Sequence, residues 1–162
     1  MLTYPTDRLL IDDWTPHLRD EVRRSALEKR LGEILTPAVL AHLPHPLQLG
    51  PRHNVSDWID ARAAEAEVHL VTMTTTGSLA GLLILAPFDG EPPDIHIGYL
   101  FAEEVWGKGL ATEMLLGLVG AAPRPVRLLA GVEAGNPASA RVLEKAGFAK
   151  PGEDGLYTLS LL

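Results

Sequence analysis

The sequence has no cysteine among its 162 residues. This absence excludes disulfide scaffolds, metal sites built on thiolates and a cysteine nucleophile. It also has no apolar run of the roughly 18–20 residues needed to cross a bilayer. The first residues carry no basic stretch followed by an apolar core, as a signal peptide would. We therefore expect a cytoplasmic protein that does not engage a membrane.

Basic side chains are also scarce, since 14 Lys and Arg face 21 Asp and Glu, for a formal net charge of −7. The electrostatic field of a protein with this negative charge repels nucleic acid on average, so we expect no nucleic-acid partner. An acidic protein would have to bind a polyanionic ligand through local groups, such as backbone amides and helix N-termini. The length and the ordinary apolar content of 46% fit a single globular domain spanning residues 1–162.

The hydrophobic periodicity predicts a mixed α/β domain. Strands are expected within 1–15 and over 67–75, 79–86, 95–101, 126–132 and 156–161; helices are expected over 17–35, 37–43, 110–119 and 136–146, with one more that Ser56 caps and that holds Trp58, Ile59 and Arg62. The turn at Gly77 should join two strands as an antiparallel hairpin. The stretch 44–54 has three prolines and a glycine, so an irregular loop is expected there.

Two glycines, Gly107 and Gly109, bracket one residue at the start of the predicted helix 110–119. The first turn of a helix has free N–H groups and a partial positive charge, so a pyrophosphate could dock there. A plain turn that needs glycine and binds nothing is the alternative. The dinucleotide fingerprint G-x-G-x-x-G fails because Thr112 stands at its last glycine, and no phosphate-binding P-loop is present. A Rossmann-type or P-loop nucleotide-binding domain therefore has no motif to support it.

A second polar helix start is formed by Asn136-Pro137-Ala138-Ser139. Asn136 is a good N-cap and Ser139 lies on the first turn, where it could bond back to Asn136. A simple capped helix would explain this segment alone. However, the two polar helix starts follow two successive strands. If these strands are parallel, both starts open at the sheet edge where ligands bind in open α/β sheets.

Three segments together resemble the GNAT acetyltransferases, most closely the RimJ/RimL subgroup. They are Thr6-Asp7-Arg8-Leu9, Ile97-Gly98-Tyr99 followed by Trp106–Glu113, and Asn136–Phe148. The resemblance implies the acyl-coenzyme A N-acyltransferase fold, with a central, mostly antiparallel mixed sheet flanked by helices. It implies transfer of the acetyl group of acetyl-coenzyme A to a primary amine, a protein N-terminus or a small molecule, by direct attack in a ternary complex. No metal is expected, and a homodimer is compatible with the family.

The resemblance also assigns the cofactor side of the site. The family motif Q/R-x-x-G-x-G/A falls on Trp106 to Ala111, where Trp106 departs from its first residue. The amides implied to hold the pyrophosphate are those of Gly107, Lys108, Gly109, Leu110, Ala111 and Thr112. The strand residues implied to lie beside the pantetheine and the acetyl carbonyl are Ile97, Tyr99 and Leu100. Asn136 would bond the pantetheine arm. Many members carry a tyrosine general acid where this chain has Leu143, and Ser139 is instead expected near the sulfur.

A base must accept the proton of the attacking amine. Members of the subgroup often have a glutamate just before the Ile-Gly-Tyr segment, and here that position is His96. A strand histidine with no catalytic task is the alternative reading. The weaker candidates are Asp94, Glu103 and Glu104. The spacings of His42, His45 and His53 match no metal motif. The departures at Leu143 and His96 keep open a second hypothesis, a GNAT-fold module that binds or senses acyl-coenzyme A without catalysis.

Overall fold

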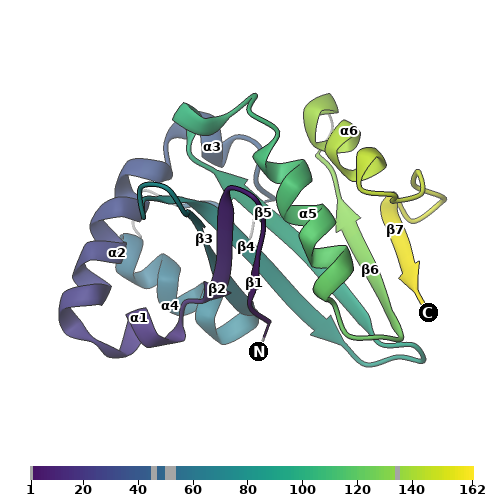
Figure 1. The fold of residues 1–162 in the computed structure, drawn as a ribbon, viewed down its shortest axis with the longest axis horizontal. Helices are drawn as coiled ribbons and strands as arrows, with labels where there is room; N and C mark the ends of the chain where they lie inside the picture. The colour runs from purple at the N-terminus through teal and green to yellow at the C-terminus, as the bar shows by residue number, and fades with distance from the viewer. Residues whose placement is uncertain (1, 45–46, 50–53, 134–135) are drawn as a thin grey trace.

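The computed structural model describes residues 2–44, 47–49, 54–133 and 136–162, which form one seven-stranded sheet (Figure 1). The strands are β1 (Tyr4–Pro5), β2 (Leu9–Asp13), β3 (Glu67–Met73), β4 (Leu79–Phe88), β5 (Asp94–Phe101), β6 (Val126–Gly131) and β7 (Leu156–Leu161). They lie in sequence order, and every neighbouring pair is antiparallel except β5 and β6, which are parallel. The predicted mixed, mostly antiparallel sheet is confirmed.

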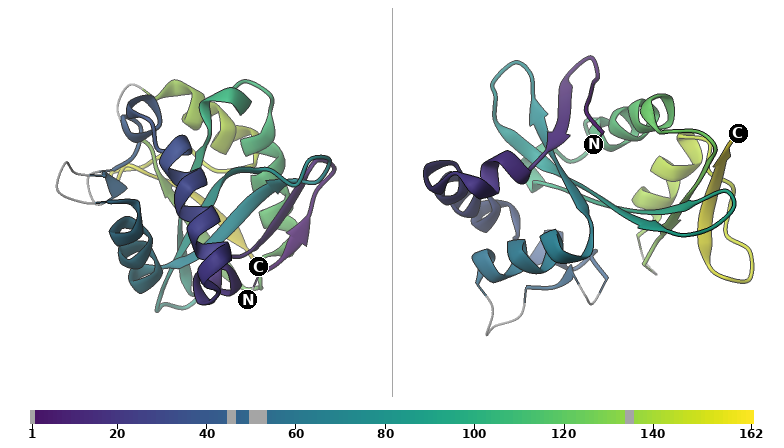
Figure 2. Two further views of the ribbon diagram at one scale, coloured as in Figure 1. Left: turned by 90° about the vertical axis from the view of Figure 1, so that its left-hand side faces the viewer. Right: turned by 90° about the horizontal axis from the view of Figure 1, so that it is seen from below.

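The helices cover both faces of this sheet. They are α1 (Thr15–Arg19), α2 (Glu21–Ile34), α3 (Pro37–Leu40), α4 (Val55–Glu65), α5 (Leu110–Ala121) and α6 (Pro137–Lys145), with a short 3₁₀ helix, η2 (Glu103–Val105). Helices α1–α4 pack on one face, while α5 and α6 pack on the other (Figures 1 and 2). In the part of the chain that the structure describes, no helix is both long and apolar enough to span a bilayer.

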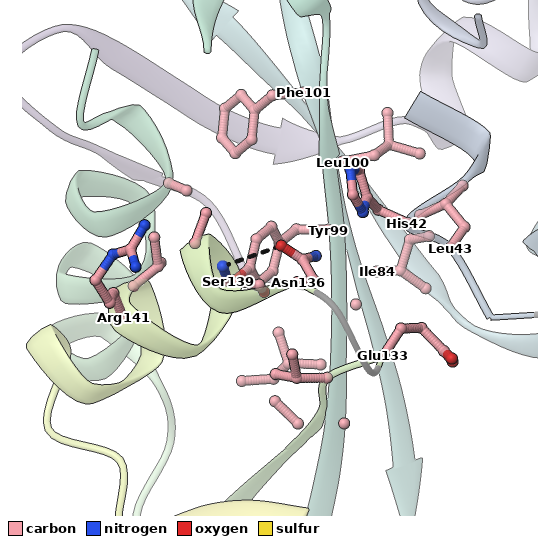
Figure 3. A pocket seen from close by; sticks show the side chains of 18 of the residues that line it. His42, Leu43, Ile84, Tyr99, Leu100, Phe101, Glu133, Asn136, Ser139 and Arg141 are labelled. Atoms are coloured by element: carbon pink, nitrogen blue, oxygen red, sulfur yellow. Dashed lines mark hydrogen bonds between the residues drawn. The ribbon is translucent and has the colours of Figure 1, made fainter. Parts of the chain in front are cut away.

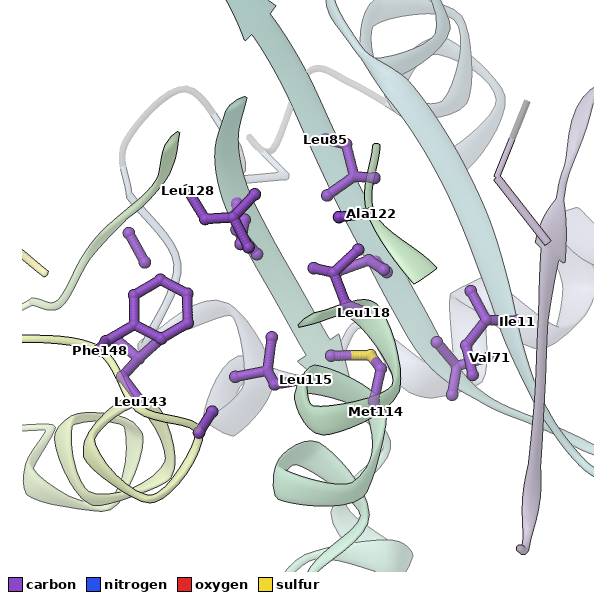
Figure 4. Packing of buried hydrophobic residues seen from close by; sticks show 14 of the residues in the cluster. Ile11, Val71, Leu85, Met114, Leu115, Leu118, Ala122, Leu128, Leu143 and Phe148 are labelled. Atoms are coloured by element: carbon purple, nitrogen blue, oxygen red, sulfur yellow. The ribbon is translucent and has the colours of Figure 1, made fainter. Parts of the chain in front are cut away.

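Each face of the sheet has its own hydrophobic core. On the α5 face, Met114, Leu115 and Leu118 are fully buried against strand residues such as Leu128 (Figure 4). Their helical spacing puts them on one side of α5. The core of the other face forms around α2 and α4. Successive side chains of a strand point to opposite faces, so the two cores fix which residues of β5 face α5 and which face α3.

Two helix starts differ from the sequence prediction. The helix expected over 17–35 is split at Asp20, which has extended φ and ψ of −107° and 121° and accepts a hydrogen bond from the Arg23 amide. Asp20 thereby caps a new helix, so α1 and α2 are separate. The cap of α4 is Asn54, not Ser56, because the Asn54 side chain accepts from the Asp57 amide at 2.8 Å. Ser56 lies inside the first turn of that helix.

The strand expected within 1–15 is a hairpin of β1 and β2. The intervening residues leave the sheet because the Thr6 hydroxyl bonds the backbone of Leu9. The helix expected over 37–43 ends at Leu40. The remaining predicted strands and helices are present with small shifts of their ends.

The parallel pair β5–β6 is short. Only Asp94, Ile95 and His96 pair with β6, whose partner residues are 127–129. β5 continues to Phe101 and β6 to Gly131, so the two strands diverge beyond His96 and leave a fork in the sheet. Both α5 and α6 begin at this fork, as the sequence predicted for two parallel strands.

Candidate functional site

A cavity of about 830 Å³ runs through the fork between β5 and β6. The residues that the sequence analysis assigned to the cofactor and to the preferred catalytic roles all line it: His96, Ile97, Tyr99, Leu100, Gly107, Lys108, Gly109, Leu110, Ala111, Thr112, Asn136 and Ser139. Figure 3 shows Tyr99, Asn136 and Ser139 on one side of β5, with His42 and Leu100 on the other. The cavity therefore has two ends, one at α5 and α6 and one at α3, that meet at β5.

The glycine loop forms the wall of the first end. Gly107 and Gly109 have φ of 74° and 76°, the left-handed region that glycine adopts without strain. Gly109 is the N-cap residue of α5, and no side chain caps this helix. The N–H groups of the first turn are therefore left for a ligand, and nothing lies within 4 Å of a Cβ built on Gly107. This geometry suits a phosphate group.

An ion pair from the N-terminal hairpin fastens this loop. Arg8 Nε donates to Glu113 Oε1 at 2.8 Å, and Arg8 Nη1 donates to the backbone carbonyl oxygen of Lys108 at 3.0 Å. Thr6 Oγ1 and the Arg8 amide both donate to the other carboxylate oxygen of Glu113. Burial would raise the pKa of Glu113, but the hydrogen bonds from Thr6 and Arg8 outweigh it and lower that pKa. Glu113 thus stays a carboxylate in the first turn of α5, with its charge balanced by Arg8.

A pair of hydroxyl groups lies where β5 faces α6. Tyr99 Oη and Ser139 Oγ are 2.8 Å apart, and the Ser139 amide donates to Asn136 Oδ1 at 3.3 Å (Figure 3). The predicted bond between Asn136 and Ser139 is thus present, through the serine amide. Burial raises the pKa of Tyr99, and the bond to Ser139 offsets part of this effect. Leu143 is 1% exposed in the core, so this position does not reach the cavity.

His96 sits at the base of the fork, on the face opposite to Ile95 and Ile97, as the strand alternation predicts. It is half-buried and its ring packs against Phe88 with centroids 4.7 Å apart. It lines the end of the cavity that faces α3, not the end with the glycine loop.

The three carboxylates considered as alternative bases lie outside the cavity lining. Asp94 accepts two hydrogen bonds from Arg127, which lower its pKa. Glu104 is bound by Arg30 at 2.7 Å, and this bond lowers its pKa as well. Glu103 is exposed on η2. None of them is placed to take a proton inside the cavity.

The sequence profile of the GNAT acetyltransferase domain matches residues 8–149 of this chain. The chain belongs to the GNAT acetyltransferase family. No curated protein sequence matches it. Among solved structures, a GNAT acetyltransferase from Bacillus anthracis is 17% identical, covers 98% of both chains and has a TM-score of 0.73. RimL, a ribosomal L7/L12 α-N-protein acetyltransferase in complex with coenzyme A, is 16% identical over 98% of both chains, with a TM-score of 0.72.

The aminoglycoside acetyltransferase AAC(6')-Ib, in complex with paromomycin and acetyl-coenzyme A, is 18% identical. It covers 95% of this chain and 94% of its own, with a TM-score of 0.69. Identities this low establish a shared fold, and the predicted GNAT fold is confirmed.

Several cavity residues of this GNAT protein were not foreseen from the sequence. Arg141 and Lys145 join Lys108 around the first end, and none of the three forms an ion pair with a described residue. Their four-residue spacing on α6 puts Arg141 and Lys145 on one face, a signal the sequence did carry. Glu133 and His42 also line the cavity, and only the fold brings them there.

No group of three metal-ligating side chains is found among the described residues. His42 lies beside the cavity, whereas His45 and His53 fall outside the part of the chain that the structure describes. Nothing in the described lining calls for a metal.

Proposed function

We propose that this protein is an N-acetyltransferase that moves the acetyl group of acetyl-coenzyme A to a primary amine by direct attack. The observation that carries the proposal is the fork between β5 and β6. It has an uncapped helix start on one side and a separate opening toward α3 on the other. The complexes of RimL with coenzyme A and of AAC(6')-Ib with acetyl-coenzyme A and paromomycin support it by their shared fold.

The end at α5 and α6 would hold the cofactor. Amides of Gly107–Thr112 would bind the pyrophosphate, as helix N-termini bind anions. Lys108, Arg141 and Lys145, which form no ion pair with a described residue, would offset its remaining phosphate charge. Beyond His96, β5 has no described partner strand on this side, so its backbone from Ile97 to Leu100 is free to bond the pantetheine arm. The loop 107–112 and the strand residues are those that the family resemblance assigns, whereas Arg141 and Lys145 are added by the structure.

Three chemical tasks then fall to residues of this chain. As the amine nitrogen bonds to the thioester carbonyl carbon, a backbone N–H within Ile97–Leu100 would polarise the carbonyl oxygen. His96 would take the proton that the amine loses, directly or through one water. The carbon–sulfur bond breaks, and the thiolate would be protonated from the hydroxyl pair of Ser139 and Tyr99. No covalent acyl-enzyme is needed.

A catalytically inactive acyl-coenzyme A-binding module is the second candidate. The buried Leu143, which cannot supply the tyrosine hydroxyl of many relatives, favours it. The hydroxyl pair of Ser139 with Tyr99 at 2.8 Å offers a substitute for that group and favours the enzyme.

Two measurements separate these functions. Isothermal titration with acetyl-coenzyme A should show binding in both cases. Release of free thiol, followed with a panel of peptide N-termini, polyamines, aminoglycosides, amino acids and simple amines, should occur only with an enzyme. Binding without thiol release from any amine would favour the sensing module. Intact-mass spectrometry after incubation with acetyl-coenzyme A alone should show no competent acetyl adduct, and a stoichiometric one would refute direct attack.

A further inference from the structure

The end of the cavity that faces α3 has apolar walls. Its floor is Gly98 of β5, where a built Cβ would lie 3.8 Å from Ile84 Cβ and 4.0 Å from Leu47 Cδ1. Leu43 and Leu100 are each less than 8% exposed and complete the wall with these side chains (Figure 3). The part of a ligand that lies against these aliphatic side chains must therefore be apolar, because they offer no hydrogen-bond partner to a buried polar group.

The wall is fastened in place by hydrogen bonds to its backbone. Trp58 Nε1 donates to the carbonyl oxygen of Leu47 at 2.9 Å, and the Gln48 side chain donates to that of Leu43 at 2.7 Å. At the rim, Trp106 keeps 45% of its surface exposed although its indole N–H is held by the Phe101 carbonyl oxygen at 2.8 Å. An aromatic ring held in this way at the mouth adds a further apolar contact for an incoming molecule.

Negative charge is almost absent from this end. Among the described residues that line the whole cavity, Glu133 is the sole acidic side chain, and it lies on the same side of β5 as Ile84 in Figure 3. The cations Lys108 and Arg141 belong to the glycine loop and to α6, at the other end. One carboxylate can balance one ammonium group.

The sequence segment that forms α3 and the loop after it contains no acidic residue. The chain has 21 acidic residues, yet none falls between Ile34 and Ser56, the segment that supplies α3 and the loop after it. The residues outside the described ranges, in this loop and at 134–135, include no Asp or Glu. A polycation would meet an apolar wall here, and each further ammonium group would be desolvated without a partner.

We infer that the acceptor is a primary amine with a single amino group on an apolar body, and not a polycation such as a polyamine or an aminoglycoside. The inference rests on the proposed function. Glu133 attracts the one ammonium group, and the wall around Gly98 takes the apolar body. A free alkylamine or arylalkylamine and a peptide with an apolar first residue both present this chemistry.

Matched pairs of acceptors test the inference directly. Thiol release from acetyl-coenzyme A is measured with hexylamine against hexamethylenediamine, which differ by one amino group. It is also measured with leucyl-glycyl-glycine against lysyl-glycyl-glycine, and the two pairs distinguish a free amine from a peptide source. We expect kcat/KM to favour the monoamine in at least one pair by about tenfold or more, which corresponds to about 1.4 kcal/mol.

Two variants and one control connect that preference to this end of the cavity. His42→Glu adds a carboxylate at the exposed rim and should shift the ratio toward the diamine by about tenfold. Ala64→Glu adds the same charge on an exposed position of α4 outside the cavity lining and should leave the ratio unchanged. Glu133→Gln should raise KM for the monoamine severalfold without changing the affinity for acetyl-coenzyme A.

The outcomes separate this inference from the function it rests on. If neither pair favours its monoamine, or if an aminoglycoside is turned over faster than every monoamine, the inference is overturned and the acetyltransferase proposal still stands. Equal shifts in His42→Glu and Ala64→Glu would also overturn it, because they would reflect net charge alone. Absence of thiol release with every amine would overturn both.

Discussion

The ion pair between Arg8 and Glu113 should control cofactor affinity from outside the cavity. Glu113 is a carboxylate in the first turn of α5, where the proposed pyrophosphate would bind. A negative charge there repels a second anion unless it is balanced, and Arg8 balances it at 2.8 Å while also holding the Lys108 carbonyl. Arg8→Met keeps most of the aliphatic stem and removes both interactions. We therefore expect this change to weaken acetyl-coenzyme A binding.

The size of the effect follows from two modest terms. The hydrogen bond lost from Arg8 to the loop carbonyl is worth about 0.5–1.5 kcal/mol. The other term is the positive charge of Arg8, which no longer balances Glu113. Arg8 is 45% exposed, so solvent screening keeps the ion pair itself within about 0–1 kcal/mol. We expect a loss of about 1 kcal/mol in binding, or about fivefold in Kd. The loss should shrink at high salt, because salt screens the exposed charges.

A double-mutant cycle separates this electrostatic role from a structural one. Adding Glu113→Gln to Arg8→Met removes the unbalanced carboxylate and should recover part of the affinity, as measured by isothermal titration. Arg19→Met, which removes an exposed charge from α1, is the matched control and should not change Kd. The reasoning is refuted if Arg8→Met lowers the thermal midpoint but leaves Kd unchanged, or if the double variant recovers nothing.

Four further predictions concern single positions. Gly109→Val forces a β-branched residue to φ of 76° at the start of α5 and should weaken acetyl-coenzyme A binding about tenfold or more; unchanged affinity in a folded variant would contradict the loop assignment. Ser139→Ala should lower turnover about tenfold to a hundredfold with little change in cofactor affinity, and comparison with Tyr99→Phe shows which hydroxyl supplies the proton. His96→Gln should lower turnover while cofactor binding is kept, and a fully active variant would move the base elsewhere. His69 is fully buried on β3, and burial lowers its pKa. Because the unfolded chain then binds this proton more readily than the folded one, the free energy of unfolding should fall as the pH drops below about 6.5. Urea unfolding of His69→Leu should show a shallower slope over that range, and an identical slope would assign the acid sensitivity to other groups.

Several parts of the site could be predicted from the sequence because they depend on local rules. Gly107 and Gly109 mark a turn with positive φ, and the apolar spacing of 110–119 specifies one buried face of α5. Asn136 and Pro137 open α6 by capping chemistry alone. Each of these signals depends on only a few neighbouring residues, so it can be recognised in the sequence without knowledge of the fold. They were enough to locate the two helix starts at the first end of the cavity, whereas the role of each residue there came from the family resemblance.

Local rules were less reliable where two signals competed. Ser56 and Asn54 are both good capping residues, and it is the Asn54 side chain that caps α4, by accepting from the Asp57 amide. The helical pattern over 17–35 concealed the break at Asp20, because the apolar spacing continues on both sides of it. The sequence thus predicted α4 with its cap two residues late, and it predicted one helix where the structure has the two helices α1 and α2.

The tertiary structure alone decided how the two ends of the cavity meet. The divergence of β5 from β6 after His96 has no signature in either strand, since pairing is a property of both. The bond between Tyr99 and Ser139 joins residues 40 positions apart, and that between Arg8 and Glu113 spans 105. Contacts of this range form only when the whole sheet and its helices pack together. The sequence by itself therefore predicted the family and the helix start that we propose as the anion site, whereas the fold decided which side chains line the two ends of the cavity.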